Sequence, residues 1–174
     1  MFESDGQGIR LNPNQVLSLQ VRGDHTITIK AHGYLDATTT QVITDARINT
    51  DECTTLTGPV KGQSYISGQP LPEIKLQLRD KYGNPLIDGP DAGITFTAEI
   101  PPGYGGGCTL SGTLTAAADA NGQVTFENIV VNLSDGVQQD SLTLRFVGTN
   151  SLGYEVDLYL TDPGTGDWIV FIVT

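Results

Sequence analysis

The residues best suited to chemistry in this 174-residue sequence are carboxylates in two Gly- and Pro-rich stretches, LRDKYGNPLIDGPD and TDPGTGDW. Carboxylate oxygens on short loops are the ligands that Ca²⁺ prefers, so a calcium site is one interpretation. Asp is equally an ordinary turn-forming residue, and neither stretch has the spacing of a known calcium-binding loop. Both interpretations stay open, and no other cofactor is expected. The candidate ligands are Asp80, Asp88, Asp91, Asp162 and Asp167.

Cysteine and histidine are too sparse to predict a zinc site. His25 and His32 point to opposite faces of an extended chain, so they cannot share a metal there. Neither Cys53 nor Cys108 belongs to a Cys-x-x-Cys pair. The two cysteines are either free thiols or one disulfide, which would contribute up to about 4 kcal/mol in an oxidising compartment.

Motifs of catalysis are missing as well. The segment GQSYISG fails the Gly-x-Ser-x-Gly pattern of hydrolases, because Ile66 stands at the position of the second glycine. No phosphate-binding or dinucleotide-binding loop is present. We therefore expect no enzyme.

Two other groups of residues are suited to binding. Arg22, Gly23 and Asp24 form the tripeptide that integrin ligands present, and their place between two alternating stretches predicts a hairpin tip; an ordinary Gly-Asp turn is the alternative. Aromatic side chains in and near loops can form a stacking platform for sugar, or belong to the core or an interface. These aromatic residues are Tyr82, Tyr104, Tyr159 and Trp168.

The composition narrows the class of partner. A formal charge of −11 argues against nucleic acid, whose phosphates require a basic surface, and against anionic lipid. No apolar run is long enough to predict insertion in a membrane. The 21 glycines and the low charged fraction of 17% favour strands and turns over helices.

Alternation of apolar and polar residues with a period of two is the main structural pattern. Each such stretch predicts a strand with one face on a core and one in water, and Gly, Pro, Asn or Asp clusters separate the stretches. The fold class expected is an all-β, Ig-like antiparallel β-sandwich. The alternating stretches span residues 15–21, 25–31, 73–79, 93–100, 141–146 and 154–160.

Two segments depart from simple alternation. In GQVTFENIVVNL the apolar residues change from even to odd positions, which predicts a bulge or strand break near Asn128. The segment DWIVFIVT is apolar on both faces, which predicts either a central strand, the interpretation we prefer, or a final strand covered by a neighbouring domain.

The turns carry a family resemblance. Asp80-x-x-Gly83-Asn84-Pro85, the following Ile94-x-Phe96 strand, and the later ADANGQVTF turn and strand resemble the Ig-like repeats of bacterial invasin- and intimin-type adhesins, and of filamins. The resemblance covers roughly residues 57–147 and implies a non-catalytic module in which Gly83 and Gly122 take positive φ and Asp80 binds backbone amides.

Ahead of this domain, the stretch GDHTITIKAHGYLDATTTQVI resembles the closing strands of small β modules repeated in Gram-positive surface proteins. We therefore expect a short β segment at residues 1–50 and an Ig-like domain at 51–174. The function expected is a spacer or binding module of a bacterial cell-surface or adhesion protein, extracellular, with neighbouring domains and a protein or polysaccharide ligand as partners. The alternatives are a carbohydrate-binding module of a secreted enzyme and an intracellular filamin-like scaffold.

Overall fold

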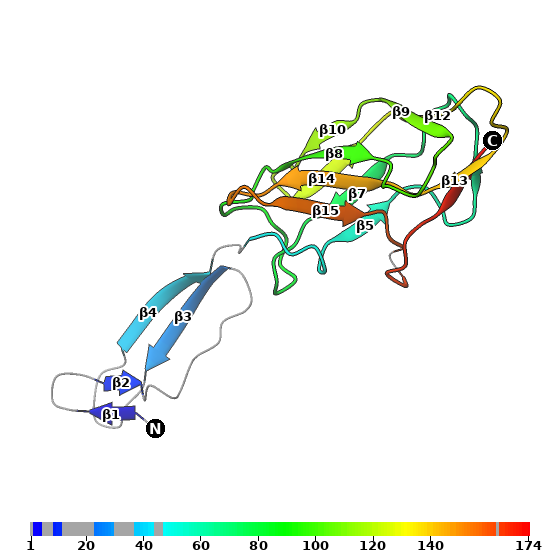
Figure 1. The fold of residues 1–174 in the computed structure, drawn as a ribbon. Coiled ribbons are helices and arrows are strands. Elements are labelled where there is room, and N and C mark those ends of the chain that lie inside the picture. Colours follow the sequence, from blue (N-terminus) through cyan, green and yellow to red (C-terminus); the bar gives the residue numbers. More distant parts are fainter. Residues whose placement is uncertain (1, 5–8, 12–22, 30–36, 44–46, 163) are drawn as a thin grey trace. The chain divides into compact units, whose positions relative to one another are not determined.

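The computed structural model describes residues 2–4, 9–11, 23–29, 37–43, 47–162 and 164–174, and these are all-β (Figure 1). The chain divides into two compact units, Met1–Ile43 and Thr44–Thr174. The sequence had placed the boundary at residue 50. The structure puts Ile48 in the second unit, where it forms an antiparallel bridge with Asp80.

The described residues of the N-terminal unit form two antiparallel strand pairs. Strand β1 (Phe2–Ser4) pairs with β2 (Ile9–Leu11), and β3 (Gly23–Ile29) pairs with β4 (Ala37–Ile43). Thr28 lies directly opposite Thr38. Residues 25–29 of the expected strand at 25–31 lie in β3, whereas residues 30–31 and the expected strand at 15–21 lie outside the described residues.

The second unit contains an antiparallel β-sandwich with the strand order of an immunoglobulin fold, as expected. One sheet has the order β11-β7-β5 and the other has the order β10-β8-β14-β15. Lettered along the chain, these are A-B-E and C′-C-F-G sheets, drawn as two layers in Figure 1. Their strands are β5 (Thr54–Thr57), β7 (Ile74–Gln77), β8 (Thr95–Glu99), β10 (Thr115–Ala117), β11 (Gln123–Phe126), β14 (Arg145–Thr149) and β15 (Glu155–Tyr159).

Five further strand segments extend one end of the sandwich. β9 pairs with β12, and β16 lies between β13 and β6. Figure 1 shows β9, β12 and β13 at the end where the C-terminus lies. The central position of β16 confirms the prediction for DWIVFIVT, although its pairing with β6 is parallel. The segments are β6 (Ser64–Tyr65), β9 (Cys108–Gly112), β12 (Ile129–Leu133), β13 (Asp140–Leu142) and β16 (Phe171–Val173).

The core is formed by every second residue of the strands, as the alternation predicts. The rings of Phe126 and Phe146, from opposite sheets, lie 4.8 Å apart. Tyr154 is an exception, because it precedes β15 and is 66% exposed. Thr143 is another, since it lies between β13 and β14, which belong to different sheets, and is fully buried. The largest buried side chains are Phe96, Phe126, Phe146, Phe171, Ile74, Leu76, Leu78, Leu86, Ile129, Leu142, Leu144 and Leu160.

The predicted break near Asn128 is confirmed. β11 ends at Phe126 and β12 begins at Ile129, while Asn128 has a φ of 59°. Phe126 and Ile129 are both buried, so the kink changes which positions face the core.

The Asp80 turn works as the sequence predicts. One carboxylate oxygen of Asp80 accepts the backbone N–H groups of Tyr82 and Asn84 at 2.8 and 3.0 Å. Gly83 has a φ of 81°, and its N–H donates to the Asp80 carbonyl. Because Asp80 is only 1% exposed, these bonds satisfy a carboxylate that would otherwise be buried at a high cost.

The same turn recurs twice. Asp119 accepts the N–H groups of Asn121 and Gln123, and the Asn150 side chain accepts those of Leu152 and Tyr154. In each turn a glycine three residues after the acceptor has positive φ. The recurring residues therefore close tight turns: the Asn150 turn joins the paired strands β14 and β15, and the other two lie between strands of different sheets.

We expect Gly122→Ala to destabilise the sandwich much more than Gly136→Ala. Both glycines have positive φ, which costs an alanine about 1–2 kcal/mol. A Cβ at Gly122 would also lie 2.7 Å from the Leu86 carbonyl oxygen, whereas a Cβ at Gly136 meets nothing within 4 Å. Urea unfolding measures both variants, and equal losses of stability would contradict the close packing of the two turns.

Candidate functional site

Three of the four candidate aromatic residues come together in the structure. Trp168 stacks on Tyr159, with ring centroids 4.2 Å apart and an interplanar angle of 7°. Tyr104 contacts the Trp168 ring at a centroid distance of 6.0 Å and an angle of 56°. Trp168 remains 42% exposed. The fourth residue, Tyr82, lies in the Asp80 turn with the Lys81 ammonium 4.8 Å from its ring centroid. Tyr104, Tyr159 and Trp168 form the aromatic cluster.

Two elements position the indole. Trp168 forms an antiparallel bridge with Thr161, which extends β15 into a hairpin. The tip is closed by Asp162, whose carboxylate accepts the N–H groups of Gly164 and Thr165 at 2.8 and 3.3 Å. Lys61 holds the other arm through Asp167 at 3.3 Å, in an exposed ion pair.

A cleft of about 500 Å³ adjoins the aromatic cluster. It lies where the edge strand β5 of one sheet faces the edge strand β15 of the other, with Leu76 and Leu158 among its apolar residues. The hydroxyl of Thr55 accepts the Thr161 N–H at 3.1 Å and joins the two edges. The polar residues that line the cleft are Thr50, Asp51, Thr54, Thr55, Asp157, Thr161 and Asp162.

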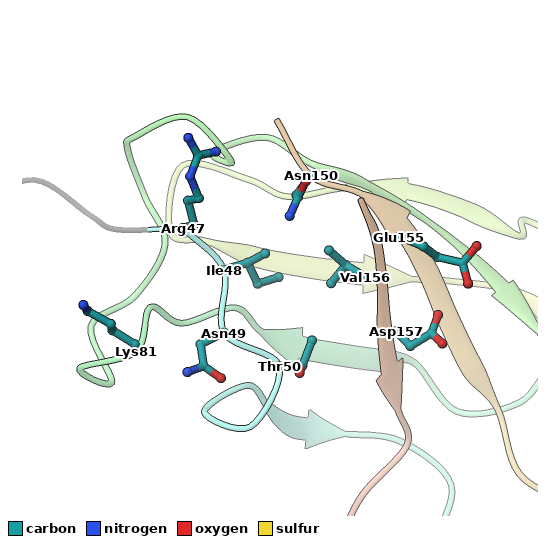
Figure 2. A pocket seen from close by; sticks show the side chains of 9 residues that line it. All are labelled: Arg47, Ile48, Asn49, Thr50, Lys81, Asn150, Glu155, Val156 and Asp157. Carbon is teal, nitrogen blue, oxygen red and sulfur yellow. The ribbon is translucent and has the colours of Figure 1, made fainter. Parts of the chain in front are cut away.

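A second, open groove of about 680 Å³ contains charges of both signs (Figure 2). Arg47 and Lys81 come from separate segments, while Glu155 and Asp157 come from β15. Figure 2 shows Lys81 well apart from the two carboxylates. The groove has mixed charge and no aromatic side chain among its described lining residues, so the aromatic cluster and its cleft are the stronger candidate site.

Asp91 attaches the start of the second unit to the sandwich. Its two carboxylate oxygens accept the N–H groups of Ser151 at 2.7 Å and Ile48 at 3.1 Å, and Arg47 donates to the Ser151 hydroxyl. Asp91 is 2% exposed. Burial alone would raise the pKa of this carboxyl, but the hydrogen bonds from Ser151 and Ile48 and the charge of Arg47 lower it below its usual value.

The expected calcium ligands do not assemble into a site. Within the part of the chain that the structure describes, no group of three or more His, Cys, Asp or Glu side chains is arranged to hold a metal ion. Asp80, Asp91 and Asp162 accept backbone N–H groups, and Asp167 pairs with Lys61. Asp88 lies at a partly buried position between the Asp80 turn and Asp91. The alternative interpretation as structural turns is the one the geometry supports.

The outer face of the four-stranded sheet carries an ion cluster beside Tyr159. Arg145 lies opposite both Tyr159 and Glu99 in the sheet register. Its guanidinium contacts Glu99 at 2.8 Å and Asp157 at 3.2 Å, and the Glu99 hydrogen bond raises the Arg145 pKa further. The cluster fixes charged side chains of three adjacent strands around the aromatic stack.

Both cysteines are free thiols, so the candidate Cys53–Cys108 disulfide is not formed. The Cys53 thiol donates to the Asn49 carbonyl at 3.2 Å and accepts the Arg79 N–H at 3.4 Å. Burial raises the pKa of Cys53 to about 11. Burial and the Asp140 carboxylate also raise the pKa of Cys108. Cys53 contacts Asn49 and Arg79, whereas Cys108 contacts Asp140. The spacing of the two cysteines in the sequence does not predict these neighbours.

The Arg22-Gly23-Asp24 tripeptide lies only partly within the described residues, so the expected hairpin tip between residues 15–21 and 25–31 stays a prediction. Gly23 and Asp24 begin β3 and lie opposite Ile43 and Val42 of β4. They are therefore at the end of the ladder remote from the segment that joins β3 to β4. Arg22 lies outside the described residues.

Comparison with known families gives one finding. Residues 2–44 match the family model described as "Heme-binding protein Shr-like, Hb-interacting domain". The match includes the four strands described in the N-terminal unit, and none of the sandwich strands. No curated protein matches the chain. In the described residues there is no helix long and apolar enough to cross a membrane.

We expect the intact mass of the native protein to be unchanged by reduction, because a disulfide would add about 2 Da when reduced. Cys53 should react slowly with iodoacetamide at pH 8, since its raised pKa leaves little thiolate. Mass spectrometry of the Cys108→Ser variant isolates this reaction, and urea should accelerate it. Fast labelling of the folded variant would contradict the burial of Cys53.

We expect Asp91→Asn to cost about 1–3 kcal/mol of stability at neutral pH, because its amide cannot accept both N–H groups. Because the Asp91 pKa is lower in the folded state, its carboxylate stabilises the fold at pH values above the unfolded pKa of about 3.9. This stabilisation is lost as the pH falls through the folded pKa. The difference from the wild type should therefore shrink at pH 3. Urea unfolding at both pH values tests this, with the exposed Asp135→Asn as control; a pH-independent difference would contradict it.

Proposed function

We propose that the chain is a non-catalytic binding and spacer region of a bacterial surface protein, and that its N-terminal unit contacts haemoglobin. The match of residues 2–44 to a haemoglobin-interacting domain model carries this proposal. The sequence resemblance to β modules of Gram-positive surface proteins falls on the same residues, which supports an extracellular location.

The geometry of β3 and β4 suits contact with a protein. Thr28, Thr38 and Thr40 are exposed. Thr28 lies opposite Thr38, and Thr40 is two positions further along the same strand, so all three share one face of the ladder. A flat row of threonines offers hydroxyl and methyl groups to a partner surface without a deep pocket.

The sandwich suits the role of spacer and neighbouring-domain support. Its strand order and its paired Asp80 and Asp119 turns support kinship with the Ig-like repeats of bacterial adhesins. The raised pKa values of Cys53 and Cys108 leave both thiols in the unreactive protonated form, which is compatible with an oxidising exterior.

Biolayer interferometry tests the proposal by measuring how the 174-residue chain binds to immobilised human haemoglobin. We expect saturable binding, and we expect Thr38→Arg to weaken it by about tenfold, or about 1.4 kcal/mol, by placing a long charged side chain in the contact. Thr109→Arg makes the same change at an exposed threonine of β9 in the sandwich and should bind normally.

Free hemin and bovine serum albumin serve as comparison ligands. Binding of hemin alone, equal binding of albumin, or an equal loss in both arginine variants would overturn the proposed protein contact. Circular dichroism of each variant separates loss of the contact from loss of folding.

A further inference from the structure

We propose that the aromatic cluster and its adjoining cleft bind a neutral oligosaccharide. This inference concerns the sandwich alone and does not depend on the haemoglobin contact of the N-terminal unit. It begins with the exposed indole of Trp168, the only tryptophan in the sequence.

The ring geometry leaves one aromatic surface open. Tyr159 stacks on Trp168 and covers one face of the indole, and Trp168 is nevertheless 42% exposed. Tyr104 adds an exposed ring inclined at 56° to the indole. The electron-rich faces of such rings attract the partly positive C–H bonds on the apolar face of a pyranose.

The cleft supplies hydrogen-bonding groups next to the rings. Thr50, Asp51 and Thr54 are exposed, and they line the same cleft as Tyr159 and Trp168. Hydroxyl and carboxylate oxygens are suitable partners for sugar hydroxyls. The volume of about 500 Å³ lies within the usual range of small-molecule sites, about 300–1,000 Å³.

Charge selects a neutral ligand. Three carboxylates line the cleft, from Asp51, Asp157 and Asp162, and no Lys, Arg or His is among its described lining residues. The whole chain carries a formal charge of −11. Uronic or sialic acids, and the propionates of a porphyrin, would be repelled by this environment.

The site is held in place before any ligand binds. The Asp162 turn fixes the hairpin that carries Trp168, and the Thr55–Thr161 bond fixes the cleft wall. The Arg145 guanidinium donates a hydrogen bond of 3.2 Å to the Asp157 carboxylate, which holds this cleft residue in place. Such prior ordering reduces the entropy lost on binding.

The test uses isothermal titration of the 174-residue chain with cellohexaose, mannohexaose, xylohexaose and hexa-N-acetylchitohexaose, and with polygalacturonate as an anionic comparison. Trp168 fluorescence is followed in parallel. We expect at least one neutral oligosaccharide to bind and to change the Trp168 emission, and we expect no binding of polygalacturonate.

Variants locate the site. Trp168→Ala should weaken binding by at least about tenfold, Trp168→Phe should retain part of the affinity, and Tyr82→Ala should bind normally because it removes an exposed ring outside the cluster. Thermal unfolding confirms that each variant is folded. The proposal is overturned if no neutral oligosaccharide binds, if polygalacturonate binds better, or if Trp168→Ala and Tyr82→Ala lose affinity equally.

Discussion

The buried amide of Gln77 connects the two Asp-Gly turns on which the sandwich depends. Its nitrogen donates to the carbonyl oxygens of Asn121 and Gly122 at 3.0 and 3.1 Å, and its oxygen accepts from the side chain of Gln123. The Leu78 N–H also donates to the Gly122 carbonyl. The carbonyl groups of the Asp119 turn therefore accept hydrogen bonds from Gln77 and Leu78, which lead into the Asp80 turn. Neither turn can shift without breaking these bonds.

The sandwich has another edge, at which β5 of one sheet faces β15 of the other. β5 and β15 are edge strands of different sheets, and the Thr55–Thr161 hydrogen bond joins them without a disulfide. The cleft and the aromatic stack occupy this edge. The proposed ligand-binding groups therefore lie apart from the Asp80 and Asp119 turns, although the Asp162 turn forms part of the cleft.

Much of the fold was predictable from local pattern. The two-residue period identified Phe96, Val124 and Phe126 as core residues, because successive side chains of a strand alternate faces wherever the strand lies. The change of period around Asn128 located the kink for the same reason. The outward position of Tyr159 followed from the alternation as well, and this made its grouping with Trp168 and Tyr104 a reasonable sequence-based hypothesis.

What the sequence determined by itself was the alternation of buried and exposed positions along most strands, together with the turns between them, since these depend on neighbours a few residues apart. Only the tertiary structure decided which distant residues meet. It stacked Trp168 on Tyr159 and left Tyr82 apart, it kept Cys53 and Cys108 as separate thiols, and it gave Asp91 two amide partners. These outcomes depend on the order of strands across two sheets, and strands with the same alternation can pair in many orders.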